Sequence, residues 1–152
     1  ASSKLLSDSS AQISVEPTLI SNTEILSKVD DVYNAIETTG SYTEKTLFYG
    51  KGAGMEPTAS AVVADIVKIV TRSNIESDYF FNSTKSFNII DSNEIKDNFY
   101  IRVSNDFDIE KSPFEIENEI DNFYIIISEN LSRNEIKEII KNAKEKIILK
   151  IS

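Results

Sequence analysis

A cluster of glycines marks a segment whose residue types suit ligand binding. Gly50, Gly52 and Gly54 are three of the four glycines in the chain and lie within five consecutive residues. Such a loop allows positive φ angles and lets a ligand approach the backbone, because no Cβ atom stands in the way. Where a helix begins after the loop, its first amides are unpaired and lie at the positive end of the helix dipole. This chemistry predicts an anion or nucleotide contact at residues 52–54.

The flanking sequence predicts a strand before the glycines and a helix after them. Residues 46–49 favour a strand, and Pro57 is tolerated at a helix start, where Thr58 can cap the following turn. Apolar residues recur with the 3.6-residue period of a helix at positions 59, 62, 63, 66, 67 and 70. A second interpretation stays open, in which the glycines form only a tight turn that lets the helix pack closely on the strand.

The spacing of the glycines matches neither of two common nucleotide motifs. The run is G-x-G-x-G, whereas the dinucleotide fingerprint is G-x-G-x-x-G. A Walker loop needs Gly-Lys followed by Ser or Thr, but here Lys51 is followed by Gly52. On the residues alone, ligand contact and packing turn therefore both stay open.

The composition argues against several classes of partner and catalyst. The 25 acidic and 16 basic residues give a net charge of −9, which argues against a nucleic acid and against an anionic membrane surface as partner. The chain has no cysteine and no histidine, so we expect no thiol nucleophile, no histidine general base and no metal site. No apolar run approaches the roughly 18 residues of a membrane helix, and we expect a cytoplasmic protein.

The rest of the sequence predicts a mixture of short strands and one further helix. Residues 1–12 are Ser-rich and expected to be loosely ordered, and residues 13–15 and 32–36 are predicted to be short strands. Polar residues dominate 73–95, which predicts a linker. The acidic residues between 106 and 121 are expected to form a solvated face.

The last third of the chain predicts a small α+β layer. Asp97–Ser104 recurs as Asp121–Ser128, and the similarity predicts two neighbouring strands. Ser132–Glu135 is a capping box ahead of a helix expected to reach Lys144, and Lys146–Ile151 is predicted to be a strand. The order places a helix over one face of a sheet.

Four segments together resemble the homoserine dehydrogenase family. Their order and spacing are similar to the end of that family's catalytic core, and the resemblance covers roughly residues 13–72. Its most specific stretch runs from Tyr49 to Ile66. The segments are Val15-Glu16-Pro17-Thr18-Leu19-Ile20, Val29 to Ile36, Phe48-Tyr49-Gly50-Lys51-Gly52-Ala53-Gly54 and Pro57-Thr58-Ala59-Ser60-Ala61-Val62-Val63-Ala64-Asp65-Ile66.

The resemblance implies an NAD(P)-dependent oxidoreductase that interconverts L-aspartate 4-semialdehyde and L-homoserine, on the route to threonine, methionine and isoleucine. It implies that Gly54 lies beside the dinucleotide, NADP or NAD, with Gly52 and the backbone of Ala53 as further contacts. It also implies that the helix after the loop packs against a nucleotide-binding sheet. The expected partners are the N-terminal part of the same enzyme, a small-molecule substrate, and further copies in a dimer or tetramer.

Two motifs of the family have no counterpart here. The dinucleotide fingerprint and the segment that holds homoserine are both absent from this sequence. No catalytic residue is therefore carried over from the family, and we expect the chain alone to be inactive.

The fold class implied is α+β. Residues 1–72 would be part of an α/β dehydrogenase core, 73–95 a linker and 96–152 a shortened ACT-like domain with the ferredoxin-like order β-α-β-β-α-β. The ACT ligand loop commonly reads Asp-x-x-Gly, but Asn105–Ile109 contains no glycine, which disfavours an amino-acid effector. About 17 residues separate the two similar strands, too few for a full helix and a strand. An alternative interpretation is an ACT-like regulatory or oligomerisation module without catalysis.

Overall fold

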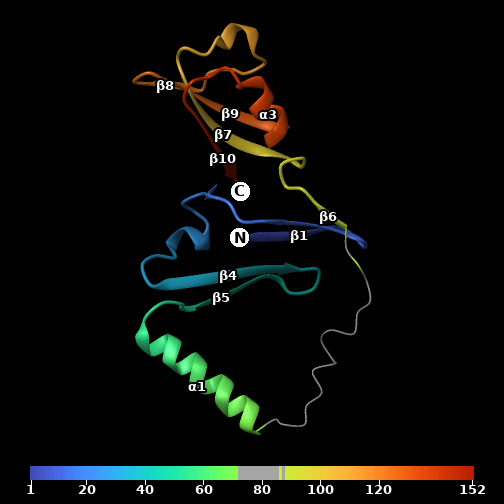
Figure 1. Ribbon diagram of the computed structural model, residues 1–152, viewed down its shortest axis with the longest axis vertical. Helices are drawn as coiled ribbons and strands as arrows, with labels where there is room; N and C mark the ends of the chain where they lie inside the picture. Colours follow the sequence, from blue (N-terminus) through green and yellow to red (C-terminus); the bar gives the residue numbers. More distant parts are fainter. Residues whose placement is uncertain (72–85, 87) are drawn as a thin grey trace. The chain divides into compact units, whose positions relative to one another are not determined.

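The computed structural model describes residues 1–71, 86 and 88–152, which form two compact units (Figure 1). One unit contains residues 1–19 together with the described residues from 86 to 152, and the other contains residues 20–71. The chain thus leaves the first unit after Leu19 and returns to it later. Most of the linker expected over 73–95 lies outside the described residues, and its described end contains a strand, β6 (Asn88–Ile90).

The N-terminal residues form a β-hairpin, so the expectation of loose order was wrong. β1 (Ser2–Ser7) and β2 (Ser10–Ser14) pair antiparallel, and β6 pairs parallel with β2. The Oγ atoms of Ser7 and Ser10 lie 2.7 Å apart at the turn. The expectation failed because the strand that completes this sheet is far away in the sequence, and the local Ser-rich composition carries no sign of it.

A five-stranded sheet forms the rest of the first unit, with the order β3-β10-β7-β9-β8. Its strands are β3 (Thr18–Leu19), β7 (Lys96–Ser104), β8 (Asn118–Ile120), β9 (Phe123–Ser132) and β10 (Lys146–Ile151). β3 runs parallel to β10, and the other neighbours are antiparallel. The two similar segments are β7 and β9, and the prediction that they are neighbours is confirmed, with Ile101 opposite Ile126. β10, β7, β9 and β8 follow the ferredoxin-like order.

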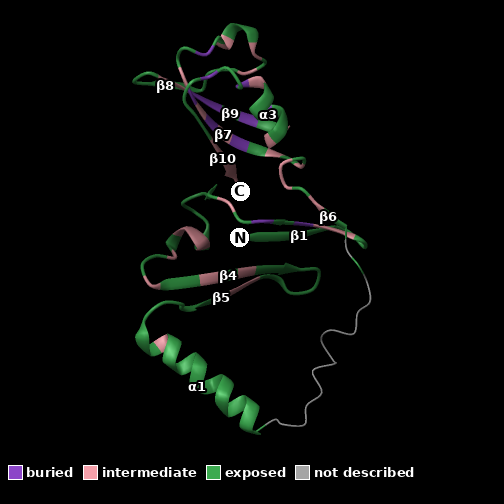
Figure 2. Cartoon of the chain, in the orientation of Figure 1, coloured by how far each residue is buried: buried purple, intermediate pink, exposed green. Residues whose placement is uncertain are grey.

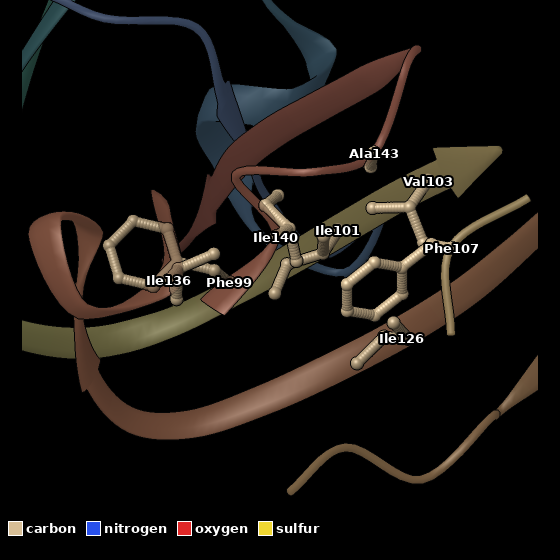
Figure 3. Packing of buried hydrophobic residues seen from close by; sticks show 8 residues of the cluster. All are labelled: Phe99, Ile101, Val103, Phe107, Ile126, Ile136, Ile140 and Ala143. Carbon is tan, nitrogen blue, oxygen red and sulfur yellow. The ribbon is translucent and has the colours of Figure 1, made fainter. Parts of the chain in front are cut away.

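The buried core lies between this sheet and α3 (Arg133–Ile139), as Figure 3 shows. Phe99, Ile101 and Val103 alternate along β7, because every second residue of a strand faces the same side. The connection from β7 to β8 contains a short 3-10 helix, η2 (Ile109–Lys111), and contributes Phe107 to the core. The full set of core side chains is Phe99, Ile101, Val103, Phe107, Ile126, Ile136, Ile140 and Ala143.

The helix expected to reach Lys144 starts as predicted but is shorter. The Ser132 side chain accepts a hydrogen bond from the Glu135 N–H at 3.2 Å, and the Glu135 carboxylate accepts one from the Ser132 N–H at 2.7 Å. α3 ends at Ile139, because the chain turns there to place Ala143 in the core and to enter β10.

The second unit contains a hairpin and a long helix. After a 3-10 helix, η1 (Ile25–Lys28), the strands β4 (Tyr33–Gly40) and β5 (Glu44–Lys51) pair antiparallel. Both strands were predicted, and both extend further than expected. α1 (Met55–Thr71) has Pro57 in its first turn, as predicted. Neither α1 nor any other helix in the described part of the chain has the length and apolar character needed to cross a membrane.

The capping box of α3 should make stability depend on pH. The pKa of Glu135 lies below its ordinary value, chiefly because the Ser132 backbone N–H donates to the carboxylate, with the Ser132 side chain adding to the effect. A carboxyl whose pKa is lowered by folding stabilises the fold above its unfolded pKa, and this stabilisation is lost as the pH falls through the folded pKa.

We predict that Glu135→Gln, which removes the charge but keeps an oxygen acceptor, lowers the urea midpoint of unfolding at pH 7. At acidic pH, below the folded pKa of the carboxyl, where it is protonated, variant and parent should unfold at the same urea concentration. Far-UV circular dichroism measures both midpoints, and Glu119→Gln on exposed β8 is the control. The same midpoint difference at both pH values would contradict the prediction.

Candidate functional site

The glycine loop continues directly from the β4–β5 hairpin. The Tyr33 and Tyr49 rings stack across the two strands, with centroids 4.9 Å apart and planes within 5°. Beyond β5, the Gly52 N–H donates to the Val32 carbonyl at 3.1 Å. The hairpin ladder therefore reaches Gly52 and leaves residues 53–54 to connect it to α1.

Gly54 must be glycine because of its backbone conformation. Its φ angle is +118°, in a region that L side chains rarely adopt. Space does not exclude a side chain, since a Cβ atom here would lie 3.5 Å from Pro57 Cδ, an ordinary contact. The Gly54 carbonyl accepts hydrogen bonds from the Thr58 N–H at 3.2 Å and from the Thr58 hydroxyl at 2.8 Å. Gly54 is thus the turn residue that starts α1.

A side chain at position 52 would displace the exposed side chain of Asn34. A Cβ atom on Gly52 would lie 1.6 Å from Asn34 Nδ2 and 2.6 Å from Asn34 Cγ. Asn34 stands on β4 opposite Gly50, so the hairpin register brings it to the loop. The sequence analysis missed Asn34, although aligning the two predicted strands in register would have placed it beside the glycines.

The three predicted contact residues lie together on an exposed segment. Gly52, Ala53 and Gly54 are consecutive and all exposed. Gly50, by contrast, has no atom within 4 Å of its Cβ position and lies within β5. The conformation of Gly54 and the tight contact at Gly52 support the structural interpretation of the glycines, and their exposure keeps them accessible to a ligand.

The hydrogen-bond donors at the start of α1 are backbone amides. Pro57 has no N–H, so the backbone amides of Gly54, Met55 and Glu56 are the ones that the helix geometry leaves without partners. The Glu56 carboxylate lies in the same first turn and opposes a phosphate there. The described residues include no group of three or more acidic side chains that could hold a metal ion. The amides at this helix start favour an electron-rich group of a ligand, and the Glu56 carboxylate in the first turn favours an uncharged acceptor over a phosphate.

The apolar stripe of α1 is not covered by the described residues. None of the helix residues is buried, and in Figure 2 α1 is exposed along almost its whole length. The large apolar side chains, each more than half exposed, are Met55, Val62, Val63, Ile66, Val67, Ile69 and Val70. Contacts within the second unit therefore do not bury this stripe, which was predicted to pack against a nucleotide-binding sheet.

The contact between residues 34 and 52 should appear as an energetic coupling. We predict that Gly52→Ala lowers the free energy of unfolding by about 1 kcal/mol, because the new methyl group displaces the Asn34 side chain. The same substitution in an Asn34→Ala background should cost much less, which gives a coupling of about 1 kcal/mol in a double-mutant cycle. Urea denaturation measures all four proteins.

Gly50→Ala is the matched control, because Gly50 pairs with Asn34 but has open space at its Cβ position. It should show no coupling to Asn34→Ala. Equal costs of Gly52→Ala in both backgrounds would mean that Asn34 does not set the requirement for glycine.

The sequence of the first part of the chain matches a known enzyme family. The family model described as homoserine dehydrogenase matches residues 1–67. Homoserine dehydrogenase of Helicobacter pylori is 49% identical over 63 residues, which cover 41% of this chain and 15% of that protein. The Neisseria gonorrhoeae homoserine dehydrogenase is 37% identical over 101 residues, covering 60% of this chain and 23% of that protein. The match begins earlier than the expected residue 13 and ends within α1.

Solved structures extend the similarity to nearly the whole chain. A homoserine dehydrogenase from Thiobacillus denitrificans has the same fold, with a TM-score of 0.73 at 21% identity over 96% of this chain and 40% of that chain. S. aureus homoserine dehydrogenase at pH 6.0 aligns with a TM-score of 0.54 at 27% identity, over 89% of this chain and 36% of that one. This chain thus spans less than half the length of these relatives. The sequence matches at its start and the shared α+β fold show that this chain is similar to homoserine dehydrogenases.

Proposed function

We propose that this chain is part of an NAD(P)-dependent oxidoreductase that interconverts L-aspartate 4-semialdehyde and L-homoserine, in the synthesis of threonine, methionine and isoleucine. The observation that carries the proposal is the exposed glycine loop at the start of α1, inside the segment that the family model matches. We place the enzyme in the cytoplasm, as a catalyst of small-molecule metabolism.

In this proposal the loop holds one side of the dinucleotide. Gly54 is the main contact, because its positive φ exposes backbone without a side chain, and Ala53 presents its exposed backbone beside it. Gly52 is a weaker contact, because its N–H donates to the Val32 carbonyl and the Asn34 side chain occupies the space at its Cβ position. The neutral amides and the nearby Glu56 favour contact with the ribose or the carboxamide over the pyrophosphate. The choice between NADP and NAD rests with residues outside this loop.

The reaction also needs groups that this chain does not provide. The bound dinucleotide supplies or accepts the hydride, and its transfer requires the substrate carbon to be held close to the nicotinamide ring. We assign this chain the task of positioning the cofactor and assign it no catalytic residue. The apolar stripe of α1 would pack against the nucleotide-binding part of the same enzyme, where each buried Val or Ile contributes about 1.5–3 kcal/mol. The whole enzyme is proposed to be a dimer or tetramer.

A second candidate function concerns the C-terminal region, residues 96–152. Its ferredoxin-like strand order supports an ACT-like module that regulates or assembles the enzyme without catalysis. The connection after β7 contains only η2 and no glycine, which favours assembly over binding of an amino-acid effector.

We predict that the isolated chain does not catalyse homoserine oxidation, because it offers only one side of a cofactor site. The whole protein that contains it should form reduced dinucleotide from L-homoserine and NADP or NAD, as followed by absorbance. Turnover by the chain alone would contradict the assignment of a positioning role. A folded whole protein without this activity would contradict the proposed function.

We also predict that Gly54→Ala in the whole protein raises the KM for the dinucleotide about tenfold. A side chain at positive φ costs of order 1–3 kcal/mol, so the loop of the free variant should relax away from this conformation. Binding must then restore it, and about 1.4 kcal/mol is a tenfold change in affinity. The KM for L-homoserine should change much less, and Gly50→Ala should leave both values within about twofold. Unchanged dinucleotide KM in a folded Gly54→Ala enzyme would leave only the packing role of the loop.

A further inference from the structure

A hollow lined by positive side chains lies between α3 and β10. Its volume is about 490 Å³, within the range of small-molecule sites. The lining residues are Arg133, Lys137, Lys141, Lys146 and Ile148. Four of these five side chains are cationic in a chain whose net charge is −9. All five lining residues belong to the first unit.

Two of the four cations are already neutralised. Arg133 forms an ion pair with Glu16, and both side chains are largely buried, 16% and 18% exposed. Arg133 also donates to the Ile148 carbonyl at 3.0 Å. Lys141 pairs with Glu138 at the exposed surface of the helix. These contacts hold the Arg133 side chain in place at the edge of the hollow and neutralise its charge.

The other two cations keep their charge without a carboxylate in ion-pair contact. Lys146 Nζ donates to the carbonyls of Ile140 and Lys141 at 3.0 and 2.9 Å. These hydrogen bonds give partners to carbonyl groups at the end of α3, but they do not neutralise the positive charge of Lys146. Among the described residues Lys137 makes no ion pair. Its charge contributes to lowering the pKa of Asp91, after the larger effect of the Asn93 amides.

The arrangement joins positive charge to an apolar surface. Two ammonium groups on neighbouring elements can each donate charge-assisted hydrogen bonds, which are about twice as strong as neutral ones. Ile148 is half-buried and gives the hollow an apolar side. A ligand that uses both features carries an anionic group and a small hydrocarbon part.

We propose that this hollow binds a small organic anion, with its carboxylate or phosphate held by Lys137 and Lys146 and its hydrocarbon part against Ile148. The site lies on the helix-bearing side of the C-terminal region. It does not depend on the oxidoreductase function proposed above.

The test is a titration of the full chain with three salts at equal ionic strength, followed by the amide shifts of 15N-labelled protein. Sodium succinate provides carboxylates with a hydrocarbon spacer, inorganic phosphate provides the phosphate group, and sodium chloride is the blank. We expect saturable shifts at residues 137, 141 and 146–148 with succinate or phosphate and none with chloride. The anion that binds identifies the preferred group.

Lys137→Gln should weaken the apparent affinity about tenfold, because it removes one charge-assisted hydrogen bond. Lys4→Gln, which removes an exposed lysine of β1, is the matched control and should leave the affinity unchanged. The amide spectrum of each variant reports whether it is folded. Shifts that chloride reproduces, or an affinity that Lys137→Gln and Lys4→Gln change equally, would overturn the proposal.

Discussion

The close approach of the residue-52 backbone to the Asn34 side chain sets the course of the glycine loop. With a Cβ position only 1.6 Å from Asn34 Nδ2, the chain can pass only as glycine unless Asn34 moves. The hairpin register fixes Asn34 opposite Gly50, and the positive φ of Gly54 then turns the chain into α1. Gly52 and Gly54 thus have structural roles in the turn. Because neither has a side chain, the same residues leave an exposed stretch of backbone. The structural and the ligand-binding interpretations of the loop are therefore compatible.

The C-terminal region is tied to the start of the chain by shared sheets. β3 pairs with β10, and β2 pairs with β6. The ion pair between Glu16 and Arg133 adds a partly buried contact, with the Arg133 guanidinium 5.1 Å from the centre of the Phe99 ring. The family model ends at residue 67, so the segment it matches contributes strands to both units. An event at the C-terminal sheet, such as ligand binding, therefore has a direct structural connection, through residues 1–19, to the segment that resembles homoserine dehydrogenases.

Local patterns predicted the elements well, and long-range pairing explains what they missed. The capping box at Ser132, the paired strands β7 and β9 and the strand–loop–helix unit around Gly54 all follow from residues close together in sequence. The β1–β2 hairpin was missed because its sheet is completed by β6. Asn34 was missed because its role depends on the register between two strands. The hollow beside Lys137 could not be predicted either, since it needs the packing of α3 against β10.

The loop and the uncovered stripe of α1 belong to one short segment, and both fit the proposal that this segment meets a nucleotide-binding part of the whole protein. The central claim is that the backbone at Gly54 contacts the pyridine nucleotide. A crystal structure of the whole protein with bound NADP tests it most directly. The account predicts Gly54 within van der Waals contact of the nucleotide, about 4 Å, with α1 buried behind it. A loop sealed beneath side chains, with the coenzyme bound elsewhere, would contradict it.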